Sequence, residues 1–248
     1  MLFSRFASAI ALTFATSAAF AGPIQTLYDG NGDPSRQGWS VEGSGTQVAH
    51  EGTTEFSTVN DPGGRTSQMY LFKYDTKATN YIASLRLQVL SSSYNNLDAA
   101  LTFSPFGDRV LSSYTRANTF MIANGKVLWG DEASSVSLDT GAFHDYQIRY
   151  DGSQLSLYID ATFADIASGA ATAALSRAVS APDVVTSMGH LVWGDATNDP
   201  NYNSHYIVDS VSFQDLDAAD VPEPSTFLLM GLGGAGLLLR RRRDVHVG

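Results

Sequence analysis

Apolar and polar residues alternate with a period of two along much of the chain, and this pattern predicts β-strands. From Leu85 to Val89 the apolar residues hold the odd positions, and Tyr146 to Tyr150 repeats the pattern, as in strands with one buried face. Asp151-Gly152 then precedes a third run, at 155–160, and predicts a hairpin because Gly accepts the positive φ of a tight turn. Further strands are predicted at 69–74, 99–103, 119–123, 126–129, 189–193 and 206–213.

These short strands, with Ser, Thr, Asn, Asp and Gly between them, predict an all-β domain over residues 22–219. An antiparallel β-sandwich or jelly roll fits this pattern best. One segment, 170–179 (AATAALSRAV), predicts a helix. The segments 127–131 and 191–195 share an apolar-apolar-Trp-Gly-Asp pattern, which we interpret as equivalent strand ends of a symmetric sandwich.

The N-terminus has the order of features found in a secretory signal peptide. Arg5 is followed by an uncharged, apolar stretch, and Ala19 and Ala21 occupy positions −3 and −1 of a cut before Gly22. A buried N-terminal helix is the alternative. The pattern predicts export and cleavage by signal peptidase, with residues 1–21 removed.

Near the C-terminus, residues 226–239 form an apolar stretch without charge. A helix of that length spans roughly 21 Å, which is short for a hydrocarbon core of ~30 Å. The next four residues predict a stop-transfer signal, because moving such a cluster across a bilayer is costly: Arg240, Arg241, Arg242 and Arg243. A buried core helix is disfavoured because these arginines could not be desolvated together.

A proline-rich motif stands directly before the apolar stretch: Val221, Pro222, Glu223, Pro224 and Ser225. The motif, the short helix and the Arg cluster together resemble the PEP-CTERM sorting signal of Gram-negative bacteria, over residues 220–248. The resemblance implies recognition by an exosortase, cleavage near the motif, transient anchoring in the inner membrane through the helix, and delivery to the cell surface or extracellular matrix. The family is associated with exopolysaccharide and biofilm.

The body of the chain resembles concanavalin A-like (laminin G-like) jelly rolls. The likeness is carried by residues 27–30 leading to 37–39, by the predicted strand at 85–90, by the hairpin at 150–160, and by 193–195 before 206–209. It implies a lectin-type or glucanase-type sandwich and says little about activity.

The charge is unevenly distributed along the sequence. The whole chain has 15 Lys+Arg and 25 Asp+Glu, a net charge of −10. Setting aside the two end segments leaves 10 basic and 23 acidic residues between 22 and 221, a net of −13. Such an acidic body excludes nucleic acid as a partner. The absence of Cys excludes disulfides, thiolate metal sites and cysteine nucleophiles.

The sequence offers no recognisable catalytic motif, and we predict that the protein is not an enzyme. There is no Gly-x-Ser-x-Gly elbow, and after Glu55 the body contains one further Glu, Glu132, so the paired carboxylates of a glycoside hydrolase are missing. Two distant Asp residues could still meet, which leaves a hydrolase or lyase as an alternative. The histidines are too scattered for a zinc motif: His50, His144, His190, His205 and His246.

Two oxygen-rich loops are candidates for calcium. One contains Asp29, Asn31 and Asp33, and the other contains Asp195 and Asp199. Alternating oxygen ligands and glycines suit calcium, and an acidic body favours cations. The alternative is that these residues form turns through local hydrogen bonds.

Candidate glycan contacts combine an aromatic ring with amides in a polar loop. We select Tyr202 with its neighbours Asn201, Asn203 and His205; the segments around Tyr94-Asn95-Asn96 and Tyr114 are further candidates. The three tryptophans lie beside apolar residues and are predicted to be core: Trp39, Trp129 and Trp193.

Together these features predict an exported, exosortase-processed protein of the cell surface or extracellular matrix that binds or organises exopolysaccharide. A purely structural matrix protein is the main alternative, and a glycan-active hydrolase is a further one.

Overall fold

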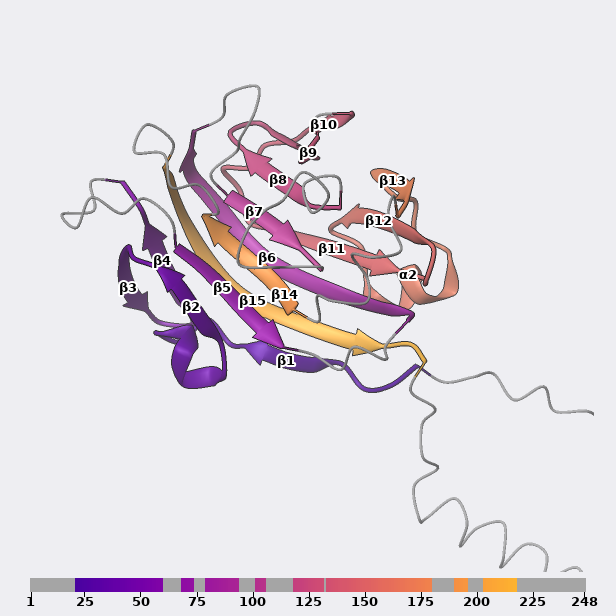
Figure 1. The fold of residues 1–248 in the computed structure, drawn as a ribbon, viewed down its shortest axis with the longest axis horizontal. Helices are drawn as coiled ribbons and strands as arrows, with labels where there is room; N and C mark the ends of the chain where they lie inside the picture. The colour runs from indigo at the N-terminus through magenta and orange to yellow at the C-terminus, as the bar shows by residue number, and fades with distance from the viewer. Residues whose placement is uncertain are drawn as a thin grey trace, which may run out of the picture. The chain divides into compact units, whose positions relative to one another are not determined.

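A computed structural model describes most of the body of the chain, all of it inside the compact unit Ala21–Ala219. The described residues are 21–59, 68–73, 79–93, 101–105, 118–131, 133–179, 190–195 and 203–217. Two antiparallel sheets pack face to face in this unit (Figure 1). The prediction of an all-β antiparallel sandwich is therefore confirmed.

The first sheet has eight strands, and the strands at the two ends of the domain pair within it. Its order is β13 (Leu175–Ala178), β12 (Gln154–Ile159), β11 (His144–Tyr150), β6 (Tyr81–Ser92), β15 (Ser204–Asp215), β4 (Thr53–Ser57) and β3 (Thr46–His50), and β1 (Gln25–Tyr28) also pairs with β15. The long strands β6 and β15 lie side by side in antiparallel register.

The second sheet has seven strands. Its order is β10 (Ser135–Ser137), β9 (Lys126–Trp129), β8 (Phe120–Ala123), β7 (Leu101–Ser104), β14 (His190–Asp195), β5 (Gln68–Lys73) and β2 (Ser40–Gly43). Two short helices complete the described part of the domain: the 3-10 helix η1 (Pro34–Gln37) and the α-helix α2 (Phe163–Ser168).

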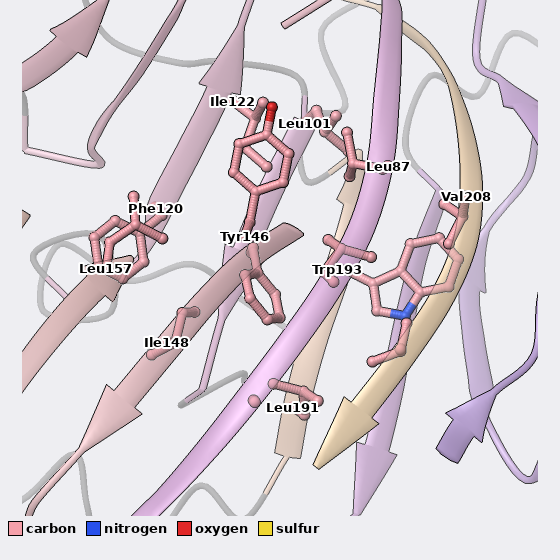
Figure 2. Packing of buried hydrophobic residues seen from close by; sticks show 14 of the residues in the cluster. Leu87, Leu101, Phe120, Ile122, Tyr146, Ile148, Leu157, Leu191, Trp193 and Val208 are labelled. Carbon is pink, nitrogen blue, oxygen red and sulfur yellow. The ribbon is translucent and has the colours of Figure 1, made fainter. Parts of the chain in front are cut away.

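The core lies between the sheets and follows the alternation read from the sequence. Leu85, Leu87 and Val89 of β6 are buried, as are Tyr146 and Ile148 of β11. Figure 2 shows such side chains from both sheets meeting: Leu87, Tyr146, Ile148, Leu157 and Val208 from one, with Leu101, Phe120, Ile122, Leu191 and Trp193 from the other.

Trp193 is the centre of an aromatic cluster that joins the two sheets. Its ring stacks on Tyr70 with centroids 4.3 Å apart, and Phe56 meets it edge-on at 5.3 Å. Trp39 and Tyr28 approach it at 5.8 and 5.9 Å. All three tryptophans are at most 3% exposed, so their prediction as core residues is confirmed.

The predicted helix at 170–179 is wrong. The chain forms strand β13 there, in which Leu175 pairs with Leu157 of β12 and is buried. The helix instead lies just before, in α2, where Thr162 caps the first turn and Gly169 ends the last one with a positive φ. Alanine-rich composition favours a helix only weakly, and pairing of Leu175 at the sheet edge outweighs it.

The repeated Trp-Gly-Asp pattern does not mark equivalent strand ends. Strand β9 does end at Trp129, but β14 continues through Gly194 to Asp195. Both strands belong to the seven-stranded sheet, with β8 and β7 between them. Because each neighbouring pair is antiparallel, β9 and β14 run in opposite directions. They therefore end at opposite ends of the sheet along the strand direction.

In the described part of the chain no helix has the length and apolar character that crossing a membrane requires. The predicted apolar helix at 226–239 lies outside the described residues, as do the predicted stop-transfer arginines 240–243.

Candidate functional site

One end of the sandwich contains two of the residues selected from the sequence, Asp195 and Asn203. Strands β4, β6 and β14 end here, and β15 begins here (Figure 1). We call it the loop end and define it by Thr58, Ser92, Ser93, Asp195, Asn203 and Ser204. The opposite end of β15, at Asp215, lies beside the start of β1 (Figure 1). Since β15 has 12 residues, the two ends are separated by about 36 Å along the strand.

A buried carboxylate, that of Asp195, links the strands at the loop end by hydrogen bonds. Asp195 is fully buried, and its Oδ2 accepts hydrogen bonds from the Thr58 hydroxyl at 2.5 Å and the Ser204 hydroxyl at 3.3 Å. The Thr58 hydroxyl oxygen in turn accepts a bond from the Ser204 amide at 3.0 Å. Buried polar groups are stable when they are hydrogen-bonded, so this network holds the exits of β4 and β14 against the start of β15.

A second contact joins the two segments that were selected as glycan contacts. The Ser93 amide donates to the Asn203 carbonyl at 2.9 Å, and the Ser92 amide donates to the Asn124 side chain at 3.1 Å. The chain therefore enters segment 94–96 and leaves segment 201–202 at adjacent positions. The candidates Tyr94, Asn95, Asn96, Tyr114, Asp199, Asn201 and Tyr202 themselves lie outside the described residues.

His205 lies next to the loop end on the outer face of the eight-stranded sheet. Its Nε2 lies 2.6 Å from Glu55 Oε1, and His50 Nε2 lies 3.1 Å from Glu55 Oε2. Hydrogen bonds from His205 and, to a smaller extent, from His50 lower the pKa of Glu55 below its usual value. Glu55 of β4 therefore links His205 of β15 to His50 of β3.

The contact of Glu55 with His50 and His205 should make the stability of the protein depend on pH. The pKa of Glu55 in the folded protein lies below 4.5. The ionised carboxylate therefore stabilises the fold fully above that pH, and this stabilisation is lost as the pH falls through the folded pKa. We expect the free energy of unfolding, measured with urea at pH 6 and pH 3, to fall more for the wild type than for Glu55→Gln. The exposed Glu51→Gln is the control and should match the wild type. An equal fall in Glu55→Gln and the wild type would contradict the prediction.

The His50–Glu55–His205 group does not have the geometry of a metal centre. His50 pairs with Thr53 and His205 pairs with Ser57, so the two histidines approach Glu55 diagonally from opposite sides. In the ranges that the structure describes, no group of three or more His, Cys, Asp or Glu could hold a metal.

The carboxylates of the loop at 29–33 are occupied by turn contacts. Asp29 Oδ1 accepts from the Asn31 amide at 3.0 Å and from the Gln37 side chain at 2.6 Å, and the Asn31 bond is the main cause of the lowered pKa of Asp29. Asp33 accepts from the Ser35 amide and hydroxyl at 2.9 and 2.7 Å and caps η1. These bonds are the local turn contacts of the alternative interpretation.

Glycine determines how close this loop comes to the sheet. A Cβ on Gly30, which has φ +76°, would lie 2.3 Å from the Asp209 carbonyl oxygen and 2.4 Å from that of Gly52. The loop therefore packs against the middle of β15, five residues from Ser204. The structure does not bring Asp29, Asn31 and Asp33 together with Asp195, and a calcium site in either loop stays a prediction.

Sequence reasoning missed the partners that fix the loop end. Thr58 and Ser204 stand in polar segments that look like ordinary turns, and they contact residues far away in sequence. Nothing in their local sequence marks them. Of the predicted signal cleavage residues, Ala19 lies outside the described part of the chain, while the Gly22 amide donates to the Asp215 carbonyl at 2.8 Å; the cleavage position stays a prediction.

Solved structures similar to this chain share low sequence identity with it, and no curated protein matches it. A carbohydrate esterase from the Shiga toxin-encoding bacteriophage phi24B is 16% identical, with 78% of this chain and 99% of that chain covered and a TM-score of 0.49. The lectin-like defence protein arcelin-5 from Phaseolus vulgaris is 12% identical, with 77% and 97% covered and a TM-score of 0.44. Lectin I-B4 from Griffonia simplicifolia is 14% identical, with 70% and 92% covered and a TM-score of 0.44.

The C-terminal segment gives the specific match. Residues 220–243 fit the model of the PEP-CTERM protein-sorting motif. They include the motif residues 221–225 and the arginines 240–243, all of which lie outside the described residues. The chain therefore carries a PEP-CTERM sorting motif behind an antiparallel β-sandwich, the arrangement of an exported protein.

Proposed function

We propose that the protein is a non-enzymatic, exosortase-processed component of the cell surface or extracellular matrix that binds extracellular polysaccharide at the loop end. Signal peptidase cuts before Gly22, and the exosortase cuts near residues 221–225 and releases the C-terminal helix. The observation that carries the proposal is the sorting motif at 220–243 joined to a sandwich in which Ser93, just before one glycan-candidate segment, bonds to Asn203, at the end of the other.

The position of the loop end supports this role. The Ser93 amide bonds to the Asn203 carbonyl, and these two residues adjoin the Tyr- and Asn-bearing segments 94–96 and 201–202 in the sequence. Aromatic rings with amides at hand can stack on sugar rings and hydrogen-bond to their hydroxyls. The loop end lies where β15 begins, whereas the chain continues toward the sorting motif after β15 ends at Asp215.

Chemistry on the described outer face favours binding over hydrolysis. Glu55 is engaged by two histidines. Arg86 lies between Asp145 and Asp209, at 2.9 and 3.0 Å. These carboxylates are committed to ion pairs and hydrogen bonds across neighbouring strands, whereas a glycosidase needs two carboxyl groups facing a scissile bond.

The test is binding of the exported protein to exopolysaccharide purified from the producing cells and to a glycan array, with and without calcium. We expect retention on the polysaccharide and about tenfold weaker binding by Tyr202→Ala. Ser153→Ala, in the hairpin turn at the opposite end of the sandwich, should bind as the wild type does.

Other outcomes separate the competing functions. No binding to any glycan would overturn the polysaccharide role in favour of a purely structural matrix protein. Release of sugar products from the bound polysaccharide would show a hydrolase or lyase. Loss of binding on calcium removal would place a cation in the site.

A further inference from the structure

The residues that follow β15 are hydrogen-bonded to the residues that precede β6. The Asp217 carboxylate accepts two hydrogen bonds from Thr79, one from the backbone amide at 2.8 Å and one from the hydroxyl at 2.7 Å. The Leu216 amide donates to the Asn80 carbonyl at 2.8 Å. The Thr79 hydroxyl is the main cause of the lowered pKa of Asp217, as expected of an ionised acceptor. We call these three bonds the exit clamp.

The N-terminal end of the domain reinforces this region from the other side. The Gly22 amide donates to the Asp215 carbonyl, and the Gln214 side chain donates to the Gly22 carbonyl, both at 2.8 Å. Strand β1 starts where β15 ends (Figure 1). The last strand is therefore fixed along its whole length, and the fold extends to Asp217.

Little chain remains between this fixed point and the sorting signal. The motif match begins at residue 220, three residues beyond Asp217, the last described residue, and the apolar stretch begins at 226. Residues 218–225 can span at most about 28 Å when fully extended. When local unfolding is fast compared with cleavage, the rate at which a protease cuts a folded chain is proportional to the population of the locally unfolded form.

We propose that the exit clamp regulates sorting: the Asp217–Thr79 contact holds Asp217 on the folded sandwich, three residues before the motif match, and so shortens the free tether and restrains processing, which proceeds through a clamp-open form. The partner is the sorting transpeptidase, and the clamp controls its access to the scissile peptide bond. This inference rests on the proposed function, in which the motif is cut. It makes the rate of release a property of the last residues of the fold.

The test follows conversion of pulse-labelled precursor to the shorter exported form in the producing cell, by immunoblot and mass spectrometry. Asp217→Ala removes the acceptor of both Thr79 bonds and should speed conversion by about fivefold, the effect of one net hydrogen bond on an opening equilibrium. Asp33→Ala is the matched control, because Asp33 also accepts from the amide and hydroxyl of one residue; it should leave the rate unchanged.

A second variant protects the test against misfolding. Inserting Gly-Ser-Gly-Ser after residue 219 alters no described contact and lengthens the tether. It should speed conversion at least as much, and adding Asp217→Ala to it should bring no further gain. Wild-type conversion rates in the insertion variant would overturn the proposal. A wild-type precursor that is never cut would instead overturn the proposed processing, and the clamp's role with it.

Discussion

Replacing Trp193 by Ala is expected to lower the free energy of unfolding by about 3–5 kcal/mol, the cost of deleting a large buried aromatic side chain. Trp193 is fully buried and contacts Tyr70, Phe56, Trp39 and Tyr28 from both sheets. A cavity there would remove contacts across the sandwich that rigid neighbours cannot replace. Urea unfolding of the exported protein measures the change, and a loss below about 1 kcal/mol would contradict the prediction.

Two phenylalanine variants separate packing from hydrogen bonding. The Trp39 indole donates to the Leu27 carbonyl at 2.8 Å, whereas the Trp193 indole finds no acceptor among the described residues. Trp39→Phe should therefore cost about 1 kcal/mol more than its packing loss, because it leaves the Leu27 carbonyl unpaired. Trp193→Phe carries no such cost. Equal losses in the two variants would show that the indole hydrogen bond is not the distinguishing factor.

Replacing Asp195 by Ala is expected to cost about 2–4 kcal/mol. The buried Ser204 hydroxyl loses its carboxylate acceptor, and the Thr58 hydroxyl loses the shorter of its two contacts, the other being the Ser204 carbonyl oxygen at 3.4 Å. Thr58 is 1% exposed and Ser204 is fully buried, so bulk water does not reach their hydroxyls in the folded protein. The same change should weaken binding at the loop end, since the network fixes the exits of β4 and β14. Urea unfolding and the polysaccharide assay measure the two effects.

A double-mutant cycle tests whether the network acts as a unit. Thr58→Val keeps the side-chain shape and removes the hydroxyl that donates to Asp195 and accepts from the Ser204 amide. Added to Asp195→Ala, it should cost less than it does alone, because residues in one hydrogen-bond network are not additive. Asp195→Asn keeps an acceptor oxygen and should be the mildest change. Strict additivity, or an Asp195→Ala variant as stable as the wild type, would mean that the carboxylate does not organise this end.

The sequence was most informative where a pattern is local. Period-two alternation identified β6, β11 and β12 and the side of each strand that faces the core, since adjacent side chains in a strand point to opposite faces. The Asp151-Gly152 turn was equally local. The sorting signal was readable because its proline motif, apolar stretch and Arg cluster follow one another in the chain.

The misreadings arose where tertiary contacts outweigh local preference. Residues 170–179 have helical composition, but Leu175 gains more by pairing with Leu157 at the sheet edge. The two Trp-Gly-Asp segments look alike, yet one continues as a strand because Asp195 has buried partners. The calcium prediction for Asp29 and Asp33 is not one of these misreadings and stays a prediction; in the fold their oxygens accept hydrogen bonds from nearby amides.

The sequence by itself determined that the chain is an exported β-protein with an acidic body and a C-terminal sorting signal, and it predicts a cleavable leader, because each of these depends on residues that are consecutive in the chain. Only the tertiary structure decided which distant segments meet: Asp195 with Thr58, Ser93 with Asn203, and Thr79 with Asp217. These pairings depend on the strand order of two antiparallel sheets. That order is set by the packing of the whole core, and no single segment records it.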